Sequence, residues 1–136
     1  MRRRSRFVLL VVAAVAAAAA AVALLGACGG DDDDGGGESV SVTDGRVTVE
    51  AEDTKYDITQ IDTVPGLLDV TMVQRGNLDH TFVVEDADGN DLDGKLAVNG
   101  QDEDSGTFEL EAGEYEYFCD IPGHRGQGME GTLVVE

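Results

Sequence analysis

The sequence predicts an all-β protein with a single β-sandwich of seven to eight short strands. Apolar and polar residues alternate with a period of two in several segments after residue 46. Turn-forming Gly, Pro, Asn and Asp separate these segments, and no segment shows a convincing helical period. About 90 residues carry the pattern, which is enough for one small domain with a single hydrophobic core.

The chain of 136 residues begins with a segment typical of a secretion signal. Four arginines within residues 1–6 precede an apolar run over 7–25, and a Leu-Gly-Ala-Cys sequence ends at Cys28. This tetrapeptide resembles a lipobox, in which cleavage before the cysteine leaves that cysteine to carry the lipids. We expect residues 1–27 to be a signal peptide and Cys28 to be the lipidation site. The alternative is that the apolar run stays uncleaved as a transmembrane anchor.

Residues 28–45 have the composition of a flexible tether. Glycine and aspartate runs follow Cys28, and no residue over 29–37 is able to join a hydrophobic core. With either kind of anchor, the tether would hold an exported domain at the extracytoplasmic face of the cell membrane. The folded domain is then expected over residues 46–136.

The composition is strongly acidic. The chain has 9 basic and 28 acidic residues, a formal net charge of −19. Removal of residues 1–27 takes away four basic residues and no acidic residue, so the net charge of the remainder is −23. This charge argues against nucleic acid or an anionic surface as a partner. The acidic residues are spread along the chain, which favours a solvated surface over the alternative of a patch that steers a basic redox partner.

The predicted strands follow one another along the chain with short turns between them. The clearest alternation of core residues occurs at Val47, Val49 and Ala51, at Phe82 and Val84, and at Phe108 and Leu110. Weaker strand patterns occupy residues 56–61, 67–74, 95–98 and 133–135. Turns are expected at 65–66, 75–77, 86–90, 99–100 and 112–113.

Strand parity places two reactive side chains on the core-facing side of the sandwich. His80 shares a strand face with Phe82, and Cys119 shares one with Tyr117. Both residues stand at an end of their strand. We therefore expect them at one end of the sandwich, where the residues after Cys119 can fold over and bring further groups to the same point.

The loop that starts at Cys119 concentrates metal-binding groups. Four residues separate Cys119 from His124, and four separate His124 from Met129. Thiolate and thioether ligands favour Cu(I), whereas imidazole also suits Cu(II), so the loop fits an ion that changes between these states. His80 is the only other histidine in the chain, and it would complete a set of two histidines, one cysteine and a weak axial methionine. With Cys28 assigned to lipid, Cys119 has no cysteine left with which to form a disulfide.

These residues resemble those of the cupredoxins, the blue-copper family that includes plastocyanin, azurin and halocyanin. The resemblance covers roughly residues 46–136, and it rests on His80 before an apolar strand, Tyr117-Phe118-Cys119, Pro122-Gly123-His124 and Gly128-Met129-x-Gly131. It implies a Greek-key β-sandwich that binds one type-1 copper ion through His80, Cys119, His124 and a weakly axial Met129. In many members an asparagine after the first histidine braces the ligand loop. Here that position is Thr81, so the bracing role is not carried over.

The resemblance implies a monomeric one-electron transfer protein that is not an enzyme, with redox proteins as its electron donor and acceptor. Copper oxidases and reductases that contain cupredoxin domains need further histidines for a second copper, and both histidines of this chain are already used. One alternative is a copper-binding or storage lipoprotein without an electron-transfer role. Another is an adhesive β-sandwich that binds no metal.

Overall fold

The computed structural model describes residues 37–100 and 102–136, and all of them belong to one compact unit. The expected signal peptide over 1–27, the lipidation site Cys28 and the first half of the expected tether, up to residue 36, lie outside the described residues. Within the described part of the chain, no helix has both the length and the apolar character needed to cross a membrane.

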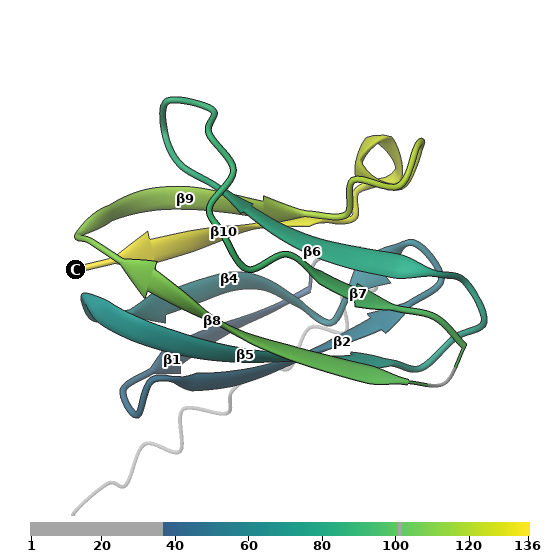
Figure 1. Ribbon diagram of the computed structural model, residues 1–136, viewed down its shortest axis with the longest axis horizontal. Coiled ribbons are helices and arrows are strands. Elements are labelled where there is room, and N and C mark those ends of the chain that lie inside the picture. The colour runs from purple at the N-terminus through teal and green to yellow at the C-terminus, as the bar shows by residue number, and fades with distance from the viewer. Residues whose placement is uncertain (1–36, 101) are drawn as a thin grey trace, which may run out of the picture. The chain divides into compact units, whose positions relative to one another are not determined.

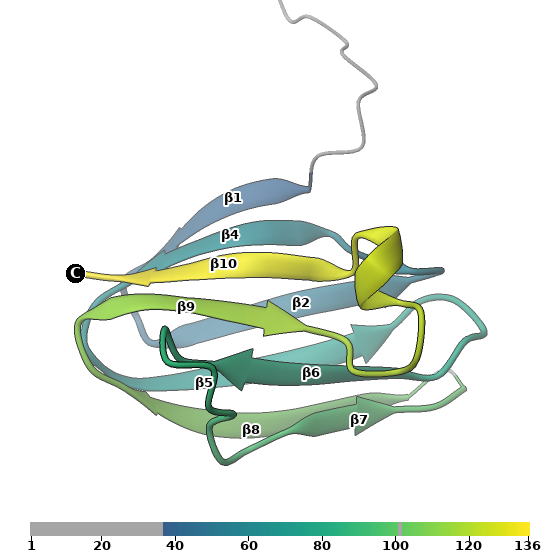
Figure 2. The same cartoon turned by 90° about the horizontal axis from the view of Figure 1, so that it is seen from above.

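The described chain folds into two β-sheets packed face to face (Figure 1). The larger sheet has the strand order β1 (Glu38–Val42), β4 (Ile58–Thr63), β10 (Glu130–Val135), β9 (Gly113–Phe118), β6 (His80–Glu85) and β7 (Leu96–Val98). The smaller sheet has the order β3 (Lys55–Tyr56), β2 (Arg46–Glu52), β5 (Gly66–Gln74) and β8 (Glu103–Leu110). A short 3-10 helix, η1 (Arg125–Gln127), lies between β9 and β10 (Figure 2).

The prediction of an all-β sandwich is confirmed, with ten strands in the described residues where seven to eight were expected. The main difference is β1, which lies inside the segment expected to be tether. Val42 is buried and Val40 packs against the core, and β1 pairs in parallel with β4 at the edge of the larger sheet. The folded domain therefore begins before residue 46, because an edge strand needs only a few inward apolar side chains to join the sandwich.

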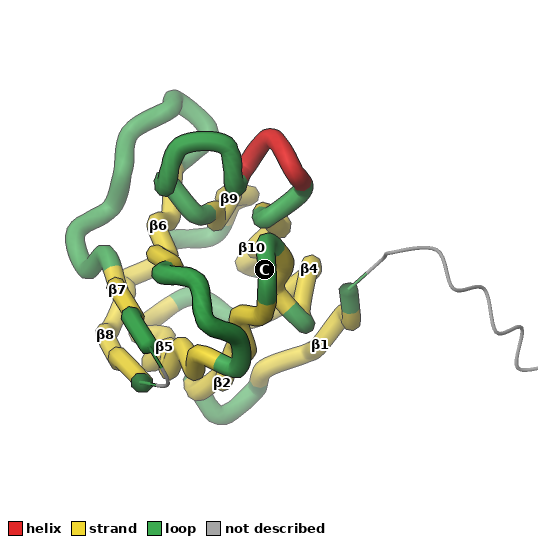
Figure 3. The backbone as a smooth tube through the Cα atoms, turned by 90° about the vertical axis from the view of Figure 1, so that its right-hand side faces the viewer, coloured by secondary structure: helices red, strands yellow, loops and turns green. Residues whose placement is uncertain are grey.

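Strand pairing brings the start of β6, the end of β9 and the start of β10 to one end of the sandwich. Phe118 pairs with Val83 of β6 on one side and with Glu130 of β10 on the other. We call this the loop end, because the connection from Cys119 to Met129 covers it. Figure 3 views the molecule from this end, with η1 in red.

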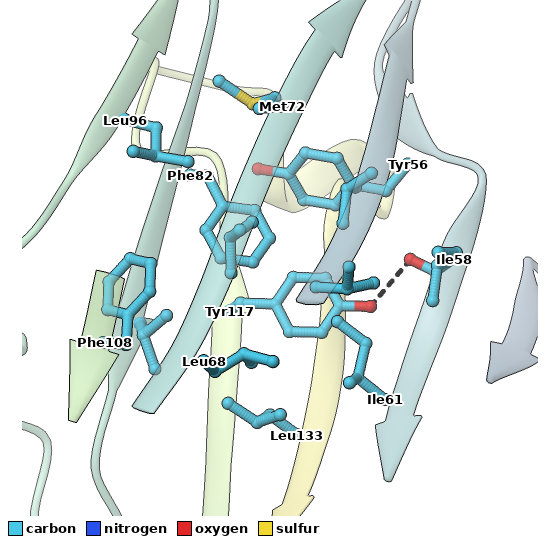
Figure 4. Packing of buried hydrophobic residues seen from close by; sticks show 14 of the residues in the cluster. Tyr56, Ile58, Ile61, Leu68, Met72, Phe82, Leu96, Phe108, Tyr117 and Leu133 are labelled. Atoms are coloured by element: carbon cyan, nitrogen blue, oxygen red, sulfur yellow. Dashed lines mark hydrogen bonds between the residues drawn. The ribbon is translucent and has the colours of Figure 1, made fainter. Parts of the chain in front are cut away.

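An aromatic cluster fills the core beneath the loop end (Figure 4). The Phe82 ring stacks on Tyr117 with centroids 4.9 Å apart, and the Phe108 centroid lies 6.0 Å from that of Phe82. The hydroxyl of Tyr117 donates a 2.7 Å hydrogen bond to the carbonyl oxygen of Ile58 on β4. Aromatic pairs of this kind add about 0.5–1.5 kcal/mol beyond their burial, so the cluster stiffens the framework below the site.

Gly131 makes room for the Tyr117 ring. The two residues are cross-strand partners, and β10 lies between β9 and β4, so the ring must cross β10 to reach Ile58. A Cβ atom at position 131 would lie 2.7 Å from Cε2 of Tyr117 and closer still to the end of the ring. Any side chain at this position therefore displaces the tyrosine.

We predict that Gly131→Ala lowers the free energy of unfolding of the metal-free protein by about 1–3 kcal/mol, since the ring has to leave its place in the core. Gly113→Ala is the control, because a Cβ atom at position 113 would meet only Cε2 of Tyr115, at 3.9 Å. Thermal unfolding measures both variants. Equal melting temperatures for Gly131→Ala and the parent protein would contradict this packing argument.

Candidate metal centre

His80 is held in the interior by the first residues of β6. It pairs with Val98 of β7, and its side chain points into the core with 1% of its surface exposed. The strand is buried on both faces, because Val83 on the outward side is covered as well as Phe82 on the inward side. The imidazole therefore has little freedom to reorient.

The loop from Cys119 to Met129 folds back on itself through backbone hydrogen bonds. The Cys119 amide donates to the Met129 carbonyl oxygen at 3.1 Å, and the Met129 amide donates to the His124 carbonyl oxygen at 3.1 Å. Gly123 and Gly128 have φ angles of 92° and 95°, in the left-handed region that glycine adopts without strain. These bends and bonds return His124 and Met129 to the end of β9, next to Cys119.

Three donor side chains converge at this point, although His80 lies far from Cys119 and His124 in the sequence. The ligand atoms of His80, Cys119 and His124 all lie within 4.8 Å of one another. Sγ of Cys119 is 3.5 Å from Nδ1 of His124, and the two imidazole centroids are 5.2 Å apart. A single ion placed among them could contact all three groups.

The imidazole of His80 has no hydrogen-bond partner at either nitrogen among the described residues. Burial, together with the neighbouring His124, lowers the pKa of His80 and favours the neutral ring. A buried polar group without a partner costs about 1–3 kcal/mol. A metal ion bound at one nitrogen would offset that cost, and neutral imidazole is the form that binds metals. The site therefore fits a metal ion.

Met129 supplies a further soft donor next to these groups. Met129 is fully buried, and backbone hydrogen bonds join it to both Cys119 and His124. Met72 is also fully buried, but it lies on β5 in the other sheet, where it packs in the core. Two imidazoles, one thiol and one thioether are the donor types of blue-copper sites.

Thr81 braces the loop end in a way that the sequence did not predict. Its amide lies 3.5 Å from Sγ of Cys119, and its hydroxyl accepts a 3.0 Å hydrogen bond from the Asp120 amide. The hydroxyl also lies 2.7 Å from Oδ1 of Asp120, so the hydroxyl proton is donated to this carboxylate. Thr81 thus links the residue after His80 to the residue after Cys119.

Lys95, the residue directly before β7, extends this brace. Its ammonium group lies 2.5 Å from Oδ2 of Asp120. The hydrogen bonds from Lys95 and Thr81 lower the pKa of Asp120, so the carboxylate stays ionised. The side chain of Asp120 is about two-fifths exposed, and it joins Thr81 to Lys95. The sequence signal that could have revealed the brace is the position of Thr81 directly after His80.

The fold and the donor set together define a class of protein: a β-sandwich with one mononuclear metal site at the end of its strands. The family model of copper binding proteins of the plastocyanin/azurin family matches residues 43–136. The chain belongs to this family. Copper is accordingly its cofactor, in agreement with the soft and mixed donors gathered at the loop end.

Solved structures with a similar fold include two auracyanins and an amicyanin. Reduced auracyanin from the photosynthetic bacterium Roseiflexus castenholzii has a TM-score of 0.62 at 17% identity, covering 70% of this chain and 99% of that one. Auracyanin A, a "blue" copper protein from Chloroflexus aurantiacus, has a TM-score of 0.55 at 23% identity, covering 71% and 100%. An amicyanin mutant has a TM-score of 0.51 at 26% identity, covering 70% and 86%. No curated protein matches the chain.

We predict that Thr81→Val lowers the free energy of unfolding by about 1–2 kcal/mol, because the Asp120 amide loses its acceptor while the side-chain volume is kept. The variant should also alter the visible spectrum of the copper-loaded protein, since Thr81 stands beside the sulfur.

Thr107→Val is the matched control for this variant. It removes a hydroxyl that lies 2.7 Å from the carboxylate of Asp69, on the other sheet. Calorimetry and absorption spectra compare the two variants, and the same response from both would show that Thr81 has no special role.

Proposed function

We propose that this protein carries single electrons on one type-1 copper ion, bound by His80, Cys119 and His124 with Met129 as a weak axial ligand. The observation that supports this most directly is the mutual approach of three ligand atoms within 4.8 Å inside a folded domain. Cysteine thiolate, methionine thioether and imidazole together accept both oxidation states of copper.

A rigid ligand frame favours fast electron transfer. His80 is held by a strand buried on both faces, and the loop after Cys119 is closed by backbone hydrogen bonds to Met129. Closely packed interiors resist deformation, so the ligands keep nearly one geometry when the ion changes its charge. Little rearrangement is then needed each time an electron enters or leaves.

His124 is the ligand through which electrons would pass to a partner. Unlike the buried His80, it is partly exposed, and the exposed Pro122 and Gly123 stand beside it. Ile121 is partly buried and packs against the core next to this surface. Uncharged residues at this point let a redox protein approach the imidazole edge with little desolvation of charge.

The anchoring of the protein is proposed from sequence features outside the described residues. The signal-like segment over 1–27 and the lipobox ending at Cys28 support export and attachment to the outer face of the membrane. An enzymatic role is not proposed, because both histidines of the chain are assigned to one site and none is left for a second copper. We propose a monomer with separate protein donors and acceptors.

Titration of the metal-free protein with Cu(II) tests the copper site. We expect an intense visible absorption that saturates at one ion per chain and disappears in Cys119→Ser, because it arises from the bond between sulfur and copper. A storage protein would instead take up Cu(I) and show no reversible response in voltammetry. A colourless copper complex of the parent protein would overturn the proposal.

Ile121→Asp tests the exit route for electrons. A charge next to His124 should slow electron self-exchange roughly tenfold or more by repelling the like-charged partner surface, while the copper absorption is kept.

Leu67→Asp is the control, because Leu67 is 66% exposed and belongs to the beginning of β5, away from the loop end. It adds the same charge to the protein. Equal slowing of exchange in both variants would attribute the effect to net charge and contradict an exit at His124.

A further inference from the structure

The side chain of Arg125 connects the ligand loop to the outer face of the larger sheet. Arg125 follows His124 and opens η1, which lies beside β9 and β10 (Figure 2). Its Nε lies 3.1 Å from Oε2 of Glu130, and its guanidinium carbon lies 3.9 Å above the centroid of the Phe118 ring. The arginine thus crosses from the loop to residues of two neighbouring strands.

The same guanidinium also pairs with two carboxylates that face each other across strands. Glu85 of β6 and Glu116 of β9 are cross-strand partners, and like charges in that position repel. The NH2 group of Arg125 makes an ion pair with Glu116 and lies 3.9 Å from Oε1 of Glu85. Three carboxylates from three strands therefore surround one cation, in a chain whose acidic residues far outnumber its basic ones.

Besides Arg125, hydrogen bonds within the loop itself hold this part in place. No residue of the described helix η1 is buried, so apolar packing does not fix it. Gly123 and Gly128 flank this part of the loop and add no side chain of their own. Within the loop, the Gln127 and Met129 amides donate to the His124 carbonyl oxygen at 3.0 and 3.1 Å, and the Gly128 amide donates to the Arg125 carbonyl oxygen at 2.9 Å. These three amides therefore report on opening of the loop.

We propose that Arg125 is a positioning residue that fixes His124 by anchoring the loop to Glu85, Glu116, Glu130 and Phe118. The forked guanidinium reaches several carboxylates at once, which the point charge of lysine cannot do with the same geometry. The anchor acts with or without the metal, so the ligand loop is held in one conformation before copper binds. The part of this inference that concerns copper rests on the proposed function.

Amide hydrogen exchange in the metal-free protein tests the anchor. In Arg125→Met, which keeps much of the side-chain volume, the amides of Gln127, Gly128 and Met129 should exchange about tenfold faster or more, because the loop opens more often. Arg125→Lys should recover part of this protection. The copper-loaded Arg125→Met protein should also show a changed reduction potential and slower self-exchange, since His124 is no longer fixed.

Arg75→Met is the matched control. It removes one positive charge that pairs with Glu50 on the other sheet, and it should leave the exchange of the loop amides unchanged. Unchanged loop amides in Arg125→Met, or equal acceleration in Arg75→Met, would overturn the positioning role.

A second variant separates anchoring from relief of charge repulsion. In Arg125→Met combined with Glu85→Gln, Glu116→Gln and Glu130→Gln, the carboxylates no longer repel one another, but the loop still lacks its anchor. Loop amides that remain unprotected support the proposal, and full recovery of protection overturns it. Because exchange is measured without metal, these outcomes do not depend on whether the parent protein forms a blue copper complex.

Discussion

The hydrogen bond from the Cys119 amide to the Met129 carbonyl oxygen closes the ligand loop, and the geometry of the site depends on it. It continues the pairing of β9 with β10 by one step beyond Phe118 and Glu130. The loop must therefore leave and re-enter the sheet at adjacent points. His124, in the middle of that loop, is brought back over Cys119. The strand on the other side of β9, which is β6, supplies His80.

Two sets of polar contacts join this closed loop to the neighbouring strands. Thr81 and Asp120 join β6 to the beginning of the loop, while Arg125 joins the middle of the loop to the carboxylates of β6, β9 and β10. Each exposed ion pair is worth little when isolated, but several pairs that share one cation and one ring act as a network. Some of the many acidic residues have a structural role here, because Glu85, Glu116 and Glu130 form ion pairs with Arg125.

Strand parity and residue chemistry were enough to predict the fold class and the side chains that meet at the loop end. His80 with Phe82, and Cys119 with Tyr117, do share inward faces, because the period of two needs no knowledge of the partner strands. The contacts that depend on sheet register could not be predicted in this way. Thr81 and Asp120 are 39 residues apart, and only the order and register of β6 and β9 bring them together. The strand β1 could not be predicted for the same reason, because its position depends on a parallel pairing with β4.

The complete burial of Cys119 has a consequence for the lifetime of the protein before it acquires its metal. Oxidants and other thiols attack cysteines that are accessible and ionised, and this sulfur is covered on every side. The folded chain is therefore protected from sulfenic acid formation and from mixed disulfides while its donors are still free. The chain can therefore fold first and take up its metal later, because the fold protects the sulfur whose oxidation would remove a ligand.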